Sequence, residues 1–372
     1  MKKLMKGNEA IAEAAVLGGC RAFFGYPITP QNEIPEYLSK RLPEVGGCFI
    51  QAESEVSAIN MVYGAAGSGA RAMTSSSSPG ISLKQEGISY ICGAELPCVI
   101  VNMVRGGPGL GGIQPAQSDY FQTVKGGGHG DYHMLVYGPG SVQEAVDIMY
   151  DAFDKADEYR MPVMILGDGM IGQIMEAVEL PEMKDPSTFP KKEWATDGTG
   201  IGANRRVVNS LYIEPDVLEA VNHRLFDRYA TLAEKETRYE TYKVEDAEIV
   251  IVAYGTVARI CKSAINMLRD KGYKVGMIRP ITLFPFPTKV IEEVAGQECV
   301  KEFISVELSM GQMIEDVKLA VNGKKPVSFY GRTGGNVMSP EDVAEFIIAK
   351  EYRTFANTIL TQTEVIQTLH CQ

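Results

Sequence analysis

The chain has 372 residues, of which 45% are hydrophobic and 22% charged, so it has enough apolar material for two or three globular domains. Its formal net charge of −11 argues against nucleic acid or anionic lipid as a partner, because these require clustered Lys and Arg. The N-terminal stretch MKKLMKGNEAIAEAA lacks the apolar core of a signal peptide, and no segment approaches the roughly 18 apolar residues of a membrane span. We therefore expect a cytoplasmic protein with no membrane or nucleic-acid partner.

Residues 1–180 alternate short apolar runs with segments of helical periodicity. Strands are predicted at 20–26, 70–74, 96–104, 133–138 and 161–167, and helices at 8–19, 53–69, 81–93 and 141–159. This alternation is typical of a parallel sheet covered by helices on both faces. It predicts a first α/β domain.

Residues 181–245 are rich in Pro, Gly and charge, and we expect a connector with one helix near 216–235. From 246 to 350 the α/β pattern resumes, which predicts a second parallel-sheet domain. The motif SPED at 339–342 predicts the start of its last helix, with Ser339 as N-cap, Pro340 at the first helical position and Asp342 as the acidic member of a capping box. Residues 351–372 form a C-terminal tail.

The seven cysteines, at positions 20, 48, 92, 98, 261, 299 and 371, are scattered along the chain. None forms the close pairs that bind zinc or iron–sulfur clusters. We therefore expect free thiols and no metal site in this chain.

The stretch FFGYPITPQNEI places Thr29 between two prolines, after a predicted strand. Thr29 as N-cap with Pro30 at the first helical position explains the pair without any function. A helix N-terminus with an exposed hydroxyl is also suited to bind an anion such as a carboxylate, so cap and site are compatible.

Glu55 has an unusual position in QAESEVSAINMVYG. On a helix it shares a stripe with Ala58, Ile59 and Val62, whereas Glu53 shares the polar face. A carboxylate on an apolar face has to be paired with a cation, protonated, or used in binding or catalysis. Both a structural ion pair and a catalytic role are open.

Arg105 opens RGGPGLGG directly after an apolar strand, just as Thr29 and the segment TSSSSPG at 74–80 follow predicted strands. Ligands of open parallel sheets bind outside the carboxyl ends of the strands. A single loop arginine is typical of a surface charge and glycines of a turn, but three polar loops at equivalent strand ends favour a shared site.

These stretches together resemble the α subunit of 2-oxoacid:ferredoxin oxidoreductases over nearly the whole chain. The matching motifs are GYPITP, QAESEVSAI, TSSSSPGISLKQEG, ELPCVIVNMVRGGPG and GGGHGDY, followed by VAYGT, IRPITLFPFP, VELSMGQM and FYGRTGG. Within that family the sequence is most similar to members that act on 3-methyl-2-oxobutanoate (2-ketoisovalerate). The resemblance implies an α/β fold with two parallel-sheet domains, a first that binds the pyrimidine side of thiamine diphosphate and a second like the C-terminal domain of transketolase.

The resemblance also implies an activity: a 2-oxoacid, coenzyme A and oxidised ferredoxin become acyl-CoA, CO2 and reduced ferredoxin. Glu55 matches the family's catalytic glutamate, which hydrogen-bonds the pyrimidine ring of the cofactor. Thr29 and Arg105, with the neighbouring Tyr26, match positions that bind the substrate carboxylate. The other positions implied to line the cofactor site are Ser77, Ser78, Gly80 and His129.

The magnesium motif of thiamine enzymes, Gly-Asp-Gly followed by Asn about 25–30 residues later, is incomplete here. LGDGMIG at 166–172 has no Asn before Asn204, so we interpret Asp168 as a strand-end residue, and GTGIGAN at 198–204 follows no strand. We therefore expect this chain to be one subunit of a complex. The resemblance implies its partners: a β subunit that shares the thiamine diphosphate and holds Mg²⁺, a γ subunit, and a ferredoxin-like δ subunit, with [4Fe–4S] clusters on these partners. Coenzyme A is the expected co-substrate and an external ferredoxin the electron acceptor.

Other functions stay open from the residues alone. One is a 2-oxoglutarate-specific member of the same family. A second is a transketolase-like thiamine enzyme subunit without an electron carrier, and a third is a catalytically silent α/β module retained for assembly.

Overall fold

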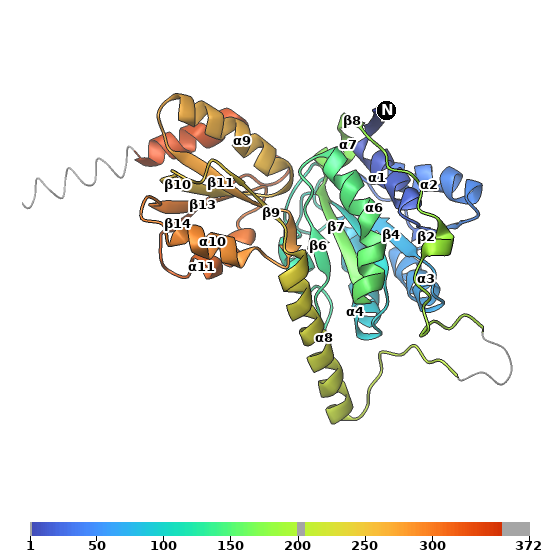
Figure 1. The fold of residues 1–372 in the computed structure, drawn as a ribbon. Helices are drawn as coiled ribbons and strands as arrows, with labels where there is room; N and C mark the ends of the chain where they lie inside the picture. The colour runs from blue at the N-terminus through green and yellow to red at the C-terminus, as the bar shows by residue number, and fades with distance from the viewer. Residues whose placement is uncertain (1, 199–204, 352–372) are drawn as a thin grey trace, which may run out of the picture.

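The computed structural model describes residues 2–198 and 205–351. It shows two α/β domains, with the long helix α8 (Pro215–Glu236) lying between them and projecting beyond both (Figure 1). The predicted fold class is confirmed. Residues 199–204 of the glycine-rich motif and residues 352–372 of the tail lie outside the described residues.

The first domain is built on a seven-stranded sheet of order β12-β6-β7-β5-β4-β2-β3. Its strands are β2 (Ala22–Gly25), β3 (Cys48–Gln51), β4 (Ala72–Ser76), β5 (Cys98–Val104), β6 (Leu135–Tyr137), β7 (Pro162–Asp168) and β12 (Thr282–Phe284). Every neighbouring pair is parallel except β12 and β6. The edge strand β3 escaped prediction because it is largely exposed and has no continuous apolar run.

Helices cover both faces of this sheet, as predicted. They are α1 (Gly7–Leu17), α2 (Glu33–Glu44) and α6 (Val142–Tyr159) on one face, and α3 (Glu55–Gly67) and α4 (Ser78–Gly93) on the other. Successive residues of β5 alternate between the two cores: Val99 and Val101 pack with α1 and α6, and Ile100 packs with α3 and α4. Burial on both sides explains why these strands are continuous apolar runs.

The second domain has a five-stranded sheet of order β14-β13-β10-β11-β9. The strands are β9 (Tyr239–Tyr242), β10 (Ile249–Val252), β11 (Val275–Pro280), β13 (Glu302–Glu307) and β14 (Val327–Gly331); the helices are α9 (Gly255–Asp270), α10 (Thr288–Ala295), α11 (Met313–Val321) and the segment 340–351. The predicted capping box of the last helix is confirmed. Asp342 N donates to Ser339 Oγ at 3.1 Å, and Ser339 N donates to Asp342 Oδ2 at 2.8 Å.

Two strands cross the predicted domain limits. β9 lies within the expected connector, yet it pairs antiparallel with β11 of the second sheet. β12 lies within the expected second domain, yet it pairs antiparallel with β6 and forms the edge of the first sheet. The two sheets are therefore each extended by a segment that sequence position assigns elsewhere.

Smaller elements complete the structure. They are β1 (Lys3–Lys6), which pairs antiparallel with β8 (Met175–Val178), the short helices α5 (Tyr120–Val124) and α7 (Gly169–Gln173), and the 3₁₀ turn η1 (Pro186–Thr188).

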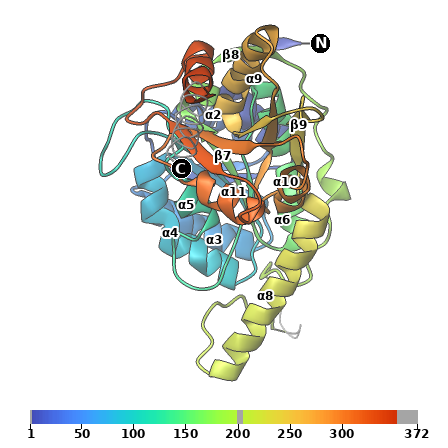
Figure 2. The same cartoon turned by 90° about the vertical axis from the view of Figure 1, so that its left-hand side faces the viewer.

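Helix α8 confirms the predicted connector helix and projects beyond both domains (Figure 2). Ion pairs attach its middle to the first domain. Arg224 and Arg228 both donate to the carboxylate of Glu95, which lies just after α4. The first half of α8 makes fewer contacts and exposes Val217 and Leu218.

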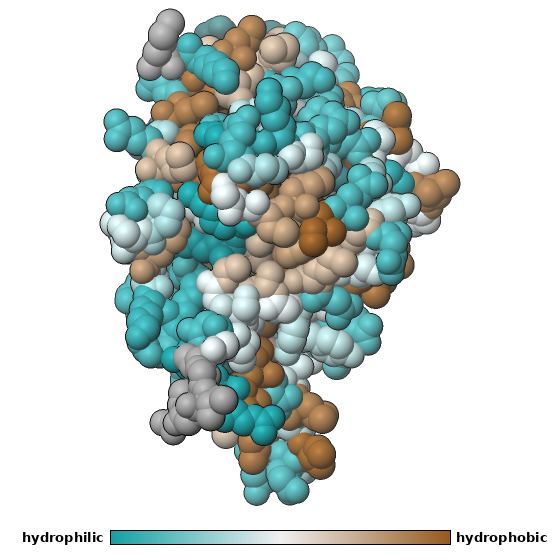
Figure 3. Space-filling view, turned by 90° about the vertical axis from the view of Figure 1, so that its right-hand side faces the viewer, coloured by the Kyte–Doolittle hydropathy of each residue, from teal (hydrophilic) through white to brown (hydrophobic). Residues whose placement is uncertain are grey.

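The face of the first domain that points away from the second domain is mainly hydrophilic, with a hydrophobic area at its centre (Figure 3). No helix among the described residues combines the length and the hydrophobicity that crossing a membrane requires.

Candidate cofactor and substrate site

The polar loops that follow β2, β4 and β5 meet at one edge of the first sheet, as expected for the carboxyl ends of parallel strands. Arg105 Nη1 donates to the backbone carbonyl of Thr29 at 3.0 Å. Arg105 N donates to Ser78 Oγ at 3.0 Å, and Ser78 Oγ is 3.2 Å from the carbonyl of Arg105, to which it donates. A single arginine thus connects all three loops.

Glu55 begins helix α3, and its side chain points inward. Ser54 is the N-cap, with its Oγ accepting from Ser57 N at 3.2 Å. Glu55 is only 7% exposed, whereas Glu53 is exposed, so the predicted orientations are confirmed. The structure shows no hydrogen bond to the Glu55 carboxylate from the residues it describes, so its oxygens can accept from a ligand.

The start of α4 presents further polar atoms without partners beside Glu55. The hydroxyls of Ser76 and Ser77 are buried, and within the described part of the chain neither has a hydrogen-bond partner. Gly80 allows Ser76 and Glu55 to lie close against the backbone of α4: a Cβ there would lie 2.1 Å from Ser76 Oγ and 2.9 Å from Glu55 Oε1. An inward carboxylate and hydroxyls without partners are suitable hydrogen-bonding groups for the edge of a small polar ring.

Arg105 retains free donor capacity at this edge. Its side chain is 7% exposed, and Nη2 donates to the carbonyl of Leu110 at 3.2 Å. Nε is buried and has no partner among the described residues. A buried guanidinium with a free N–H is able to donate to an anion.

The predicted cap at Thr29 is wrong. Helix α2 begins at Glu33 with Asn32 at the N-cap, and Thr29 lies in the preceding turn with a cis peptide bond to Pro30. Thr29 and Tyr26 are both exposed, and the Tyr26 carbonyl accepts from Gln31 Nε2 at 3.4 Å. The hydroxyl of Thr29 is therefore not used by the helix.

His129 does not join this cluster. Its carbonyl accepts from Ser89 Oγ at 2.7 Å, and its ring lies edge-on to Tyr90 with centroids 6.2 Å apart. Ser89 is about three turns of α4, roughly 16 Å, from Ser78. In this chain the histidine is thus separate from the other predicted cofactor-binding residues.

Asp168 ends β7, as predicted, and caps α7. Its Oδ1 accepts from the N–H groups of Met170 and Ile171, each at 3.0 Å. Burial raises the pKa of this carboxyl. Among the described residues, no group of three His, Cys, Asp or Glu side chains is arranged to hold a metal ion.

Lys84 was missed by the sequence analysis, although its position on α4 carried the signal. It shares the buried stripe of Ile81, Ile88 and Ile91. Its Nζ donates to Thr74 Oγ1 at 2.7 Å and to the carbonyl of Ser75 at 3.0 Å. The stripe argument that singled out Glu55 would have found it.

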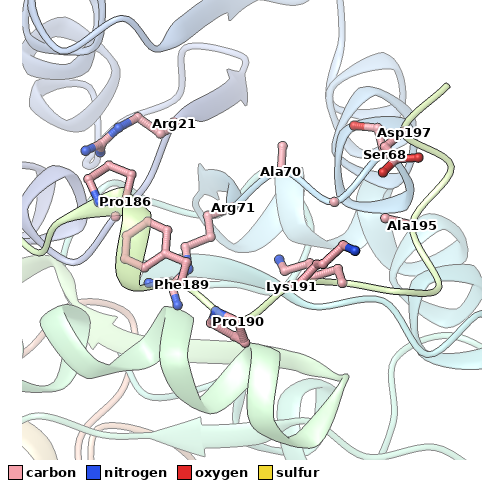
Figure 4. A pocket seen from close by; sticks show the side chains of 13 residues that line it. Arg21, Ser68, Ala70, Arg71, Pro186, Phe189, Pro190, Lys191, Ala195 and Asp197 are labelled. Atoms are coloured by element: carbon pink, nitrogen blue, oxygen red, sulfur yellow. The ribbon is translucent and has the colours of Figure 1, made fainter. Parts of the chain in front are cut away.

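A hollow with a volume of about 330 Å³ lies at the end of the sheet opposite the candidate site, between the amino ends of β2 and β4 and the connector (Figure 4). Arg71 on its wall pairs with Asp154 at 2.6 Å and Asp157 at 2.9 Å, and stacks on Phe189. Lys192 also pairs with Asp157, at 2.6 Å. These cations have acidic partners, so they attach the connector to the domain.

Comparison with known proteins identifies the family. Residues 13–241 match the family described as pyruvate flavodoxin/ferredoxin oxidoreductase, thiamine diP-binding, and residues 247–343 match pyruvate:ferredoxin oxidoreductase core domain II. The ketoisovalerate oxidoreductase subunit VorB of Methanothermobacter marburgensis is 51% identical over 341 residues, covering 92% of this chain and 96% of that protein. The 2-oxoglutarate synthase subunit KorA of Methanocaldococcus jannaschii is 36% identical, with coverages of 93% and 99%.

Solved structures agree. The 2-oxoglutarate:ferredoxin oxidoreductase from Magnetococcus marinus, with 2-oxoglutarate, coenzyme A and succinyl-CoA bound, matches with a TM-score of 0.82 and 25% identity. The match covers 94% of this chain, which spans 65% of the length of that neighbour. A split-gene transketolase, at a TM-score of 0.56 and 16% identity, shares the fold. The chain therefore belongs to the pyruvate flavodoxin/ferredoxin oxidoreductase family, as a 2-oxoacid:ferredoxin oxidoreductase subunit.

Proposed function

We propose that this chain holds the pyrimidine half of thiamine diphosphate and the carboxylate of a 2-oxoacid, preferentially 3-methyl-2-oxobutanoate. The observation that carries the proposal is the inward carboxylate of Glu55, a residue only 7% exposed, which lies at Gly80 together with the Ser76 hydroxyl, a buried group with no hydrogen-bond partner among the described residues. These groups fit the edge of an aminopyrimidine ring, which needs hydrogen bonds from the protein, and Gly80 allows the Glu55 carboxylate and Ser76 to lie together at the start of α4.

Bound thiamine diphosphate supplies a nucleophilic carbon for the 2-oxo group and an electron sink once CO2 is lost. Glu55 would share a proton with the ring nitrogen of bound cofactor, and the low exposure of this residue would limit competition from water. Ser77 and Ser78 at the start of α4 bring the positive end of that helix to the site.

The substrate carboxylate is assigned to Arg105 and Thr29. Nε of Arg105 is a buried donor without a partner in the described residues, and the hydroxyl of Thr29 is exposed on the adjoining loop. A charged donor and a hydroxyl on two stiff loops orient one carboxylate, and Tyr26 lies on the same loop as Thr29. This fixes the distance of the 2-oxo carbon from the cofactor.

Names and identities of the relatives support the substrate. The two ketoisovalerate oxidoreductase subunits are 50–51% identical to this chain, whereas the 2-oxoglutarate synthase subunits are 33–36% identical. Substrate choice within one fold depends on the apolar lining of the pocket, which diverges with overall identity. A 2-oxoglutarate-specific enzyme would need a second cation for the distal carboxylate.

We infer that the activity requires partners: a β subunit that binds the diphosphate through Mg²⁺, and γ and ferredoxin-like δ subunits with [4Fe–4S] clusters, serving coenzyme A and an external ferredoxin. The use of Asp168 as a helix cap supports this, because it removes the one Gly-Asp-Gly carboxylate from metal binding. The six described cysteines are free, which fits the reducing cytoplasm.

The experiment compares Glu55→Gln with Glu53→Gln in the purified complex. Glu55→Gln should assemble but lose thiamine diphosphate affinity by calorimetry and turnover by at least about a hundredfold, because the proton-sharing group is gone. The exposed Glu53→Gln is the matched control and should behave as wild type. Equal effects of the two changes would overturn the role assigned to Glu55. A higher kcat/KM for 2-oxoglutarate than for 3-methyl-2-oxobutanoate would overturn the proposed substrate preference.

A further inference from the structure

Lys84 is a buried amine whose hydrogen bonds, within the described residues, go to no acidic group. Its side chain is fully buried, and the acceptors of its Nζ are the Thr74 hydroxyl and the Ser75 carbonyl, both neutral. An ammonium group removed from water and given neutral acceptors is unfavourable. Methionine has a similar shape and would fill the same space without this cost, so packing alone does not explain a lysine here.

The position of Lys84 relates it to Glu55. Lys84 lies one turn after Gly80 on α4, so both residues face the same way. Gly80 is the residue whose backbone lies against the Glu55 carboxylate and Ser76. The acceptors of Lys84, at 74 and 75, directly precede Ser76 on β4. Lys84 therefore lies beneath the proposed pyrimidine site, between the strand end and the helix that form its floor.

Among the described groups around Lys84, Glu55 supplies the opposite charge that acts on it. Burial lowers the pKa of Lys84 to about 7, and the negative charge of Glu55 on α3 opposes that shift. β4 presents hydroxyls and a carbonyl, and Ser75 Oγ donates to Gln31 Oε1 at 2.5 Å. The other buried carboxyl near the start of α4, Asp119, is bonded to Asn102 Nδ2 at 2.9 Å.

We propose that Lys84 is a positioning residue that balances the charge of Glu55, holding a proton while Glu55 is a free carboxylate and releasing it when Glu55 shares a proton with the pyrimidine ring. The proposal rests on the proposed function of Glu55. One proton enters at Glu55 and the ring, and one leaves Nζ of Lys84 for solvent. The net charge of this buried region is zero before and after, which avoids an uncompensated charge in a medium of low polarity.

The test is the number of protons taken up when the purified complex binds thiamine diphosphate with Mg²⁺. It is obtained by calorimetry in two buffers of different ionisation enthalpy. Lys84→Met should take up about three-quarters of a proton more than wild type near pH 6.5, because the compensating release is gone. The difference should vanish by about pH 8.5, where Lys84 is already neutral in the free enzyme. Protonation of the diphosphate is the same in both proteins and cancels.

Lys40→Met, on the exposed side of α2, is the control and should match wild type. Lys84→Arg keeps a permanent charge, so it should show the same extra proton uptake and bind thiamine diphosphate roughly tenfold more weakly. If Lys84→Met does not assemble, the proton uptake of Lys84→Arg provides the test. Proton uptake in the Lys84 variants equal to that of wild type at pH 6.5 would show a merely structural lysine. Failure of the wild-type complex to bind thiamine diphosphate would instead refute the proposed function.

Discussion

Arg105 Nη1 donates to the backbone carbonyl of Thr29 at 3.0 Å, so the two residues assigned to one substrate carboxylate are themselves hydrogen-bonded. The contact uses the Thr29 main chain, and the Thr29 hydroxyl and Arg105 Nε remain for a ligand. A change in the Thr29 side chain therefore leaves the anchor of Arg105 intact. The two side chains can be tested separately.

Arg105→Lys should lower kcat/KM for every 2-oxoacid by about 1.5–3 kcal/mol, because lysine keeps the charge but loses the planar, multiply anchored donor. Thr29→Val should cause a smaller loss of about 1 kcal/mol, from one hydroxyl bond. Since Thr29 does not cap α2, this variant should retain wild-type stability. Steady-state kinetics with 3-methyl-2-oxobutanoate and pyruvate gives both values. A large change in the ratio of the two substrates, with little loss of rate, would mean that these residues contact the substrate side chain instead.

Gly80→Ala should weaken thiamine diphosphate binding at least tenfold, while the subunit still folds. The new methyl group would overlap Ser76 Oγ and crowd the Glu55 side chain, so it would displace the polar groups of the site. Gly64→Ala on α3 is the matched control, because a Cβ there meets nothing within 4 Å. It should stabilise the helix by about 0.5–1 kcal/mol and leave binding unchanged. Calorimetry and thermal unfolding of both variants provide the check; unchanged affinity in Gly80→Ala would place the ring elsewhere.

Glu307 should be essential for the stability of the second domain. It is fully buried, and its two oxygens accept from the hydroxyls of Ser305 and Ser309. They also accept from the first N–H groups of α11, at residues 312, 313 and 314. Glu307→Gln would turn an amide donor towards these donors, and should lower the free energy of unfolding by at least about 2 kcal/mol. The exposed Glu315→Gln, measured in the same urea titration, should change it by less than about 0.5 kcal/mol.

Burial of Lys84 also predicts a pH dependence of stability. Between about pH 7 and 10 the unfolded chain holds a proton on Lys84 that the native chain lacks, so stability should rise with pH in this window. The contribution has a slope of up to about 1.4 kcal/mol per pH unit, and Lys84→Met should remove it. Thermal unfolding midpoints of the two complexes, compared from pH 7 to 9, should converge as the pH rises. A constant offset would mean that Lys84 keeps its proton when folded.

Much of this fold could be predicted because it is encoded locally. The apolar runs that became β4, β5 and β7 are buried on both faces, and such runs are visible without any partner. The edge pairings of β9 and β12 were not predictable in this way, because they depend on contacts between residues distant in sequence.

The candidate site, too, could be predicted only in part. The inward direction of Glu55 followed from helical spacing, but its place at the first turn of α3, with Gly80 against its carboxylate, depends on tertiary packing. The cap at Thr29 failed because the chain makes another turn before α2 begins at Glu33. Lys84 was overlooked because a lysine followed by Gln85 and Glu86 suggests a solvated position, although its helical stripe is apolar.

The antiparallel pairing of β12 with β6 affects what happens when the chain is cut at the connector into two fragments. A fragment ending near residue 245 would contain every other strand of the first sheet but would leave the outer edge of β6 open. Open strand edges pair readily with other chains. Gene fragments, limited proteolysis products and fusion proteins that separate the halves at the connector should therefore self-associate through β6, and a peptide carrying residues 282–284 and their flanks should suppress that association.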